Sequence, residues 1–403
     1  MTKTHPTTRI VVLGGGYAGV LAANHLRQRD AVQITLVNAR KVFVERIRLH
    51  QLVTGSDDAV VDYQTLLGQG IRLVVDSATH IDAATRTVAL ASGGTLPYDY
   101  LIYAVGSTGA TPSVPGAQFA YPISDLEHAL RLRAAVAEAP TGAPLVVVGA
   151  GPTGIETAAE LAEGRGGGKD TVGRSVTLVC GTVLGPYLST PGRRSVARRL
   201  TKLGVTVLDG PGATVTAVTE DAVTLADGRE LPSAVTIWTA GFGVPELAAR
   251  SGLTTDTLGR LLTDETLTSV DDPRIIAAGD ASAPSNQPLR MSCQAALPLG
   301  AQAANTVLSR IAGEQPAVIN QAFTGQCISV GRAGATIQIA RTDDTVLPLY
   351  IGGRAAAAVK EAVCKGTISF LSREARKPGA YFWLKGGKRQ RHLAAAATKA
   401  AVE

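Results

Sequence analysis

The feature that most constrains the fold is a glycine pattern that occurs twice, each time between a strand and a helix. The apolar run Arg9–Leu13 leads into Gly14, Gly16 and Gly19, and a helix-like stretch and a second apolar run follow. In this order, Gly-x-Gly-x-x-Gly predicts a dinucleotide-binding fold. We expect Gly14 to allow the tight turn, Gly16 to let a pyrophosphate approach the backbone, and Gly19 to let the helix pack closely on the strand. The helix N-terminus then holds the phosphates.

A second copy begins 135 residues later. The apolar run Leu145–Val148 precedes Gly149, Gly151 and Gly154, and a helix and the apolar run Ser175–Val179 follow. Two such folds require two dinucleotides, of which one stays bound and the other exchanges. This arrangement implies electron transfer between a flavin and a nicotinamide.

Composition and charge exclude several other classes of protein. No apolar run approaches the ~18 residues that span a bilayer, and the polar start is not a secretory signal, which predicts a cytoplasmic protein. The net charge is +6, but residues 351–403 hold 11 Lys and Arg against 3 Asp and Glu. This basic tail predicts contact with an anionic surface, either a nucleotide or the inner face of the cell membrane, and a merely solvated tail is an equal alternative. Nucleic acid is not expected, because the tail has no binding module and few aromatic residues.

The four cysteines, Cys180, Cys293, Cys327 and Cys364, are far apart in the sequence. Without a Cys-x-x-Cys motif, they favour a reducing compartment, and we expect neither a disulfide framework nor a metal site.

Together with the glycine turns, three further motifs resemble a known family. They are Tyr98–Ser107 (YDYLIYAVGS), Ile237–Gly241 (IWTAG) and Ile275–Ala281 (IIAAGDA). Across about residues 9–380, the chain is similar to the flavoproteins with two dinucleotide-binding domains, and most similar to type II NADH dehydrogenases and the apoptosis-inducing-factor-like ferroptosis suppressor. The resemblance implies FAD on the first unit and NADH or NADPH on the second.

The expected fold class is α/β, with two Rossmann-like dinucleotide-binding domains and a small α+β C-terminal module. The FAD-binding domain is expected to be discontinuous, formed by residues 1–115 and 256–320. The NAD(P)-binding domain is expected at 116–255, and the C-terminal module with its basic tail at 321–403. The oligomeric state cannot be predicted from the sequence.

Several residues outside the glycine turns are expected to contact FAD. Asp280 follows a strand and a glycine, Gly279, so its carboxylate can accept hydrogen bonds from the ribityl hydroxyls, with a helix N-cap as the alternative. Asn38 stands where an acidic residue usually receives the ribose hydroxyls. By the resemblance, Ala104 and Gly106 also line the FAD site, and Gln294 matches a family glutamine. A second glutamine of the quinone-reducing pattern is replaced by Pro298.

Two residues are predicted to be catalytic. Glu156, in the first turn of the second unit's helix, matches a residue of the family's nicotinamide site and could contact the carboxamide. The alternative is a carboxylate that suits the helix dipole. Lys365 lies near a lysine of the ferroptosis suppressor's C-terminal region, where a cation would stabilise reduced flavin. The alternative is a solvated lysine.

The position of the redox cysteine in related disulfide reductases is occupied here by Phe43 and Val44. Electrons are therefore expected to pass directly from the flavin to the acceptor. The adjacent Glu45 and Arg46 either line the flavin cavity or form a surface ion pair.

These observations predict an NAD(P)H oxidoreductase that passes two electrons through FAD to a quinone-type acceptor. Two alternatives are a reductase of a protein electron carrier and an NAD(P)H-binding redox sensor. The preference for NADH or NADPH cannot be predicted, since the end of the second unit's strand, at Cys180, carries neither an acid nor a base.

Overall fold

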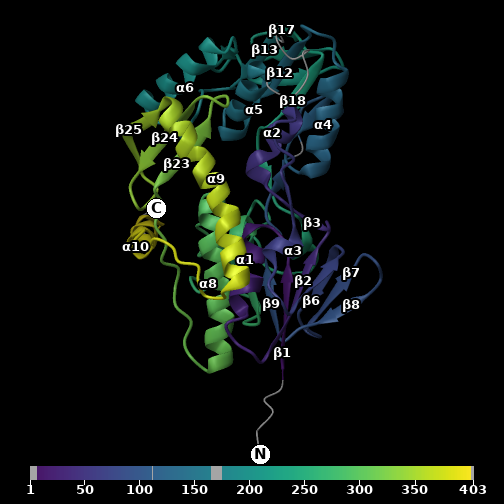
Figure 1. The fold of residues 1–403 in the computed structure, drawn as a ribbon, viewed down its shortest axis with the longest axis vertical. Coiled ribbons are helices and arrows are strands. Elements are labelled where there is room, and N and C mark those ends of the chain that lie inside the picture. Colours follow the sequence, from purple (N-terminus) through teal and green to yellow (C-terminus); the bar gives the residue numbers. More distant parts are fainter. Residues whose placement is uncertain (1–6, 111, 165–174, 401–403) are drawn as a thin grey trace, which may run out of the picture.

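The computed structural model describes residues 7–110, 112–164 and 175–400. Figure 1 shows two α/β units stacked along the long axis of the molecule, with the long helix α9 running beside both. A smaller antiparallel sheet lies next to the second unit. The expected α/β class with two parallel sheets is confirmed.

The first unit is built on a five-stranded parallel sheet of order β21-β9-β1-β2-β5. Its strands are β1 (Thr8–Leu13), β2 (Val32–Asn38), β5 (Ile71–Val75), β9 (Tyr100–Tyr103) and β21 (Ile275–Ala277). Apart from the edge strand β5, which has no buried residue, they are near-continuous apolar runs, as expected for strands that are buried on both faces. The strand β21, from far along the chain, pairs with β9, so the unit is completed only after the chain has formed the second unit.

Helices cover this sheet, and short strands form small separate sheets beside it. The helices are α1 (Tyr17–Leu26), α3 (Tyr63–Leu66) and α8 (Cys293–Ala312), with the 3-10 turns η1 (Arg46–Arg48) and η3 (Gly279–Ala281). The short helix α2 (Leu49–Thr54), which follows η1, packs instead in the core of the second unit. The additional strands are β3 (Val42–Val44), β4 (Val60–Asp62), β6 (Ala78–Asp82), β7 (Thr87–Leu90), β8 (Thr95–Pro97), β20 (Leu261–Thr263) and β22 (Ser282–Pro284). Side chains of α1 and α8 pack together in the main core of this unit.

The second unit repeats this plan. Its parallel sheet has the order β11-β18-β12-β13-β14, formed by β11 (Ala120–Pro122), β12 (Pro144–Val148), β13 (Ser175–Val179), β14 (Thr206–Leu208) and β18 (Val235–Trp238). The helical elements are η2 (Ala117–Phe119), α4 (Leu126–Glu138), α5 (Pro152–Glu163) and α6 (Thr190–Lys202). The helix α7 (Leu247–Arg250), after the returning segment, packs on the first unit. A meander of β15 (Val215–Val218), β16 (Ala222–Leu225) and β17 (Glu230–Pro232) corresponds to β6–β8 of the first unit.

The chain crosses between the two units at one short ladder. Here β10 (Thr108–Gly109) pairs antiparallel with β19 (Phe242–Gly243). The segment that leaves the first unit and the segment that returns from the second are therefore paired with each other where the chain crosses.

The C-terminal residues form a small sheet and a long helix, and an ion pair holds the segment after that helix against the rest of the protein. The sheet contains β23 (Gly325–Ser329), β24 (Ala335–Ala340) and β25 (Val346–Gly352), and α9 (Gly353–Arg376) and α10 (Arg389–Ala400) follow. The basic tail is not free along its length, because the Arg389 guanidinium donates to both carboxylate oxygens of Glu265, at 2.6 and 2.9 Å.

Candidate functional site

The first glycine turn has the geometry that the sequence predicted. Gly14 has a φ of +101°, and a Cβ there would lie 2.2 Å from the carbonyl oxygen of Ala104. A Cβ on Gly19 would lie 1.8 Å from the Gly14 carbonyl oxygen. By contrast, among the described residues, the chain neighbours apart, nothing lies within 4 Å of the Cβ position of Gly16. Gly16 therefore leaves room for a group that is not part of the chain, as a bound pyrophosphate requires.

A cavity of about 260 Å³ opens directly over this turn. Most of the residues that were predicted to bind FAD line it, namely Gly14, Gly16, Asn38, Ala104, Gly106, Gly279 and Asp280. They come from the ends of β1, β2, β9 and β21, because the carboxyl ends of parallel strands meet at one edge of the sheet.

Asn38 also shapes the turn. Its Oδ1 accepts a hydrogen bond from the Gly15 amide at 2.9 Å, and its Nδ2 donates to the Arg40 carbonyl at 2.8 Å. The side chain thus fixes the glycine loop without adding a negative charge.

Asp280 and Arg46 meet at Ser107. The Ser107 hydroxyl donates to Asp280 Oδ2 at 2.7 Å, and Arg46 Nη1 donates to the Ser107 carbonyl at 2.8 Å. Burial lowers the pKa of Arg46, an effect that the nearby Asp280 opposes. Arg46 was expected either to line the flavin cavity or to form a surface ion pair. The structure shows that it lines the cavity over the first glycine turn. A bound dinucleotide would find both a carboxylate and a guanidinium here.

The second glycine turn repeats the first. Gly149 has a φ of +129°, and a Cβ on Gly154 would lie 2.0 Å from the Gly149 carbonyl oxygen. Again the middle glycine, Gly151, has no atom of the described, non-neighbouring residues within 4 Å of its Cβ position. At the end of β13, burial raises the pKa of the Cys180 thiol to about 12, so this residue carries no charge at neutral pH.

Glu156 lies buried between the second unit and the C-terminal residues. Its Oε1 is 3.1 Å from Lys360 Nζ and accepts hydrogen bonds from the Ser329 amide and hydroxyl at 3.0 and 3.1 Å. Its Oε2 is 3.7 Å from His50 Nδ1. Burial alone would raise the pKa of Glu156, but Lys360 and these hydrogen bonds outweigh it and lower the pKa. The carboxylate is therefore ionised, and its partners come from three separate elements.

Lys360, and not the predicted Lys365, is the lysine of α9 that contacts Glu156. Burial would lower the pKa of Lys360, but Glu156 outweighs it and the pKa is raised. The side chain of Lys365 is 74% exposed and lies 3.6 Å from Glu361. Lys365 is thus away from the cluster, and its catalytic role finds no support in this position.

A signal in the sequence could have identified Lys360. The buried residues of α9 include Ala356, Cys364, Thr367 and Leu371, which recur at three- and four-residue spacing. Lys360 continues this stripe, since residues four apart lie on one face of a helix, whereas Lys365 lies off it.

His50 is the third member of the cluster around Glu156. Burial lowers the pKa of His50 to about 4, so the imidazole is neutral at neutral pH. It contacts Glu156 as a polar neighbour and not as a cation.

Gln294 stands in the first turn of α8 and does not line the cavity over the glycine turn. Its Nε2 donates to the Thr324 hydroxyl at 2.7 Å, and Arg290 Nη2 donates to its Oε1 at 3.4 Å. The predicted cofactor contact of Gln294 stays a prediction.

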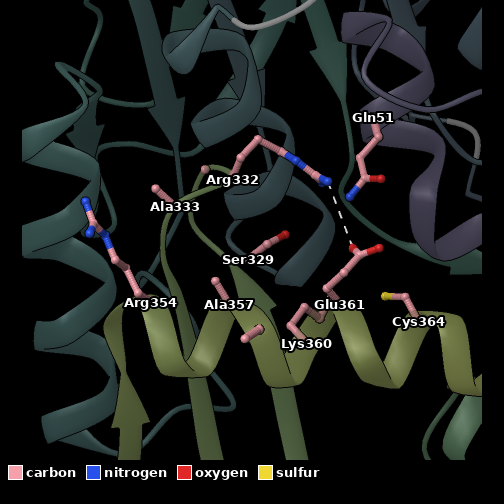
Figure 2. A pocket seen from close by; sticks show the side chains of 11 residues that line it. Gln51, Ser329, Arg332, Ala333, Arg354, Ala357, Lys360, Glu361 and Cys364 are labelled. Atoms are coloured by element: carbon pink, nitrogen blue, oxygen red, sulfur yellow. Dashed lines mark ion pairs between the residues drawn. The ribbon is translucent and has the colours of Figure 1, made fainter.

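A second cavity, of about 280 Å³, lies above α9 and reaches Lys360 (Figure 2). Figure 2 shows Ala357 and Lys360 along the helix, Ser329 and Arg332 on the facing strand and turn, and Gln51 arriving from α2. We call it the α9 cavity; its lining residues are Gln51, Ser329, Gly331, Arg332, Ala333, Arg354, Ala357, Ala358, Lys360, Glu361 and Cys364. It combines small apolar side chains with charged ones, Lys360 and Glu361 toward one end and Arg354 toward the other.

Comparison with known proteins agrees with this architecture. The profile of the family described as pyridine nucleotide-disulphide oxidoreductase matches residues 8–300. An NADH dehydrogenase-like protein of Mycobacterium tuberculosis is 31% identical over 352 residues, covering 81% of this chain and 87% of the relative. The type II NADH:quinone oxidoreductase Ndh of the same organism is 30% identical, covering 77% and 74%.

Among solved structures, the sulfide:quinone oxidoreductase of Aquifex aeolicus has the same fold. Its TM-score is 0.77 at 20% identity, covering 91% of this chain and 92% of that one. The glycine turns, the two parallel sheets and the sequence matches lead to one assignment: the chain belongs to the pyridine nucleotide-disulphide oxidoreductase family, among its NADH dehydrogenase-like members.

Proposed function

We propose that the chain is a FAD-dependent NAD(P)H:quinone oxidoreductase. The observation that carries this proposal is the pair of glycine turns, each with a middle glycine, Gly16 or Gly151, that is open to a ligand. Phe43 and Val44 stand in place of a redox cysteine, so no thiol carries electrons at that position. The similarity to a type II NADH:quinone oxidoreductase over about three quarters of both chains supports a quinone as acceptor.

The residues of the first unit suit FAD. Gly16 gives the pyrophosphate room, Asn38 holds the glycine loop, and Asp280 offers a carboxylate to hydroxyl groups. When bound, FAD supplies the two-electron chemistry that couples a nicotinamide to the acceptor. The protein binds and orients both partners, and the buried Glu156–Lys360 pair keeps a fixed charge arrangement between the second unit and α9.

We place the quinone in the α9 cavity. Ala333, Ala357 and Ala358 offer an apolar surface for a flat ring, and Lys360 and Ser329 offer donors to its oxygens. Ala357→Trp would fill this cavity, whereas Ala355→Trp, on an exposed part of the same helix, would not.

Stopped-flow mixing under anaerobic conditions tests the proposal. NADH or NADPH should bleach the flavin absorbance, and menadione or a short-chain ubiquinone should restore it faster than oxygen does. Ala357→Trp should slow the quinone step at least tenfold without changing the nicotinamide step, and Ala355→Trp should change neither. Recovery with ferredoxin but with no quinone would favour the protein-carrier alternative, and slow recovery with every acceptor would favour the sensor.

The C-terminal residues suit a membrane surface. Phe370, Tyr381, Phe382 and Trp383 form a connected aromatic cluster, with ring centroids 5.7 to 6.5 Å apart. Phe382 and the neighbouring Leu384 are 67% and 59% exposed. Exposed aromatic residues beside basic ones are typical of proteins that dock on anionic lipid. Within the described residues, none of the helices combines the length and apolarity needed to cross a bilayer.

Vesicle flotation tests this docking. The protein should float with vesicles that contain phosphatidylglycerol and much less with pure phosphatidylcholine. Phe382→Ala with Leu384→Ala should abolish flotation. Phe242→Ala, which removes a half-exposed aromatic ring at the crossing between the units, should not change it. Equal flotation of both variants would contradict the assignment of this face.

A further inference from the structure

The strand β13 ends without the group that usually selects between the two nicotinamide nucleotides. In a dinucleotide-binding fold, an acid at this strand end accepts the ribose 2′-hydroxyl of NAD, or a nearby arginine accommodates the 2′-phosphate of NADP. Here β13 ends at Val179, and the next residue is Cys180. The buried thiol of Cys180 is uncharged at neutral pH, so it brings no charge of either sign to the site.

The neighbouring strand β14 ends beside this position with an acid. The strands β13 and β14 are parallel and in register, and Asp209 follows β14 directly. The Cys180 amide donates a hydrogen bond to the Leu208 carbonyl at 2.8 Å. Beyond the strand ends, the Gly210 amide donates to the Thr182 carbonyl, also at 2.8 Å. Because adjacent strands lie about 5 Å apart, these two bonds hold Asp209 next to Cys180.

Asp209 also lies on the same face of the sheet as Cys180. Cys180 and Val207 pack in the core that the sheet shares with α5 and α6, whereas Leu208 packs on the opposite face, against β15 and β16. Side chains alternate along a strand, so Asp209 follows Val207 onto the face that carries Cys180. Burial is the main cause of the raised pKa of the Cys180 thiol, and the Asp209 carboxylate raises this pKa further, as expected for two groups that are close together.

The Asp209 carboxylate is open to a ligand. It is exposed, and within the described part of the chain it has no hydrogen-bond or ion-pair partner. The Gly185 amide donates to the Ala150 carbonyl at 3.0 Å, so the segment after Cys180 returns to the second glycine turn. A dinucleotide whose pyrophosphate rests at Gly151 directs its adenosine ribose to the end of β13. The ribose hydroxyls would meet the Asp209 carboxylate there.

No base competes for this position on the two strands. Neither β13 and β14 nor the three residues after each of them include a lysine or an arginine. The first arginine after β13, Arg193, belongs to α6. The start of this helix is held against β24, since the Ser189 hydroxyl donates to Gln338 Oε1 at 2.7 Å. Arg193 Nη2 donates to the Leu188 carbonyl at 3.4 Å. The two strand ends therefore contribute only a negative charge.

We propose that Asp209 makes the second unit selective for NADH. Its carboxylate accepts hydrogen bonds from the ribose hydroxyls of NADH and repels the 2′-phosphate of NADPH. The acid that usually stands at the end of one strand is thus supplied by the end of the next. This inference rests on the proposed function, and it names which of the two nicotinamide nucleotides the enzyme oxidises.

A first test measures binding and not turnover. Calorimetric titration of the flavin-loaded protein compares NAD⁺ with NADP⁺, and NAD⁺ should bind at least about tenfold more tightly. Asp209→Asn should reduce this ratio about tenfold, because a hydrogen bond to a charged group is stronger than one to a neutral group. Asp209→Arg should reverse the preference. The control Glu138→Arg makes the same change of charge at the end of α4 that leads to the amino end of β12, and should leave the preference unchanged.

The second test follows the two half-reactions in the same variants. NADH should bleach the flavin absorbance of the wild type at lower concentrations than NADPH, and Asp209→Arg should reverse this order. Recovery with menadione should stay within about twofold of the wild-type rate in both variants, because Asp209 contacts the nucleotide and not the acceptor. A variant of Asp209 that slows the recovery as much as the bleaching would contradict a role in nucleotide selection.

The possible results separate this inference from the function beneath it. If neither NAD⁺ nor NADP⁺ binds and neither reduced form bleaches the flavin, the proposed function and the selectivity are both overturned. If the flavin of the wild type is reduced but NADP⁺ binds as tightly as NAD⁺ or more tightly, only the selectivity is overturned. A preference for NAD⁺ that Asp209→Asn and Asp209→Arg leave unchanged overturns the role of Asp209.

Discussion

Replacing Lys360 with methionine should show how much the stability of the folded protein depends on the positive charge beside the buried Glu156 carboxylate. The two side chains are 15% and 8% exposed, and the Nζ–Oε1 distance is 3.1 Å. Removing one member of a buried pair costs about 3–5 kcal/mol, because the remaining charge has no compensation. Lys360 also donates to the Cys327 carbonyl at 3.2 Å, and the loss of that bond adds about 1 kcal/mol at any pH.

The pH dependence identifies the cause. In the wild type, the pKa of Glu156 is lowered, so its stabilising contribution is present near neutrality and is lost as the pH falls. Without Lys360, burial dominates and the pKa of Glu156 rises above that of the unfolded chain, ~4.3. Lys360→Met should then lose about 1.4 kcal/mol per pH unit relative to the wild type above this value, until the folded pKa is reached.

The assay is urea unfolding from pH 4.5 to pH 8. We expect the free energies of unfolding of Lys360→Met and the wild type to differ by about 1 kcal/mol at pH 4.5 and by about 3–5 kcal/mol at pH 8. The double variant Glu156→Gln/Lys360→Met should recover most of the loss at pH 8. A difference that is equal at all pH values, or a double variant no more stable than Lys360→Met, would refute this reasoning.

Three further predictions concern the two glycine turns and Lys365. Gly16→Val should leave the unfolding free energy within about 1 kcal/mol but give a colourless protein, whereas Gly19→Val should lose about 1–3 kcal/mol or more, as absorbance and urea titration would show. Gly151→Val should keep its flavin colour while bleaching by NADH slows at least tenfold, and an unchanged rate would contradict the assignment of the second turn. Lys365→Ala should change the unfolding free energy by less than about 0.5 kcal/mol, and a loss near that of Lys360→Met would contradict the placement of the two lysines.

Much of the fold could be predicted because its decisive residues act locally. Gly14 and Gly19 are required by a positive φ and by the approach of one carbonyl oxygen within the same turn. Such a requirement can be seen in a short stretch of sequence. The apolar runs on either side then fix strands that are buried on both faces.

The surroundings of Glu156 could not be predicted in the same way. Ser329, Lys360 and His50 approach it from β23, α9 and α2, and no spacing in the sequence joins these positions. Gln294 shows the same limit, because its partner Thr324 lies 30 residues further along the chain. Contacts of this kind depend on how separate elements pack.

The basic tail is predicted from counts of charged residues. Such counts do not show which charged side chains are paired inside the folded protein. Lys360 is buried against Glu156, and Arg389 is fastened to Glu265. Part of the excess charge is therefore used inside the protein. The exposed aromatic cluster, and not charge alone, distinguishes this surface.

The helix α9 has a consequence for how the chain can vary in length. It is a single run of 24 residues, about 36 Å long, that is tied to α5 through Lys360 and to α1 through a 2.7 Å contact between Glu374 and His25. Inserting one residue between the two ties would turn one of them by about 100° relative to the other. Inserting a whole turn would restore the direction of both side chains but would move the two contacts about 5.4 Å further apart. The helix α9 therefore fixes both the direction and the spacing of its contacts with the two nucleotide-binding units.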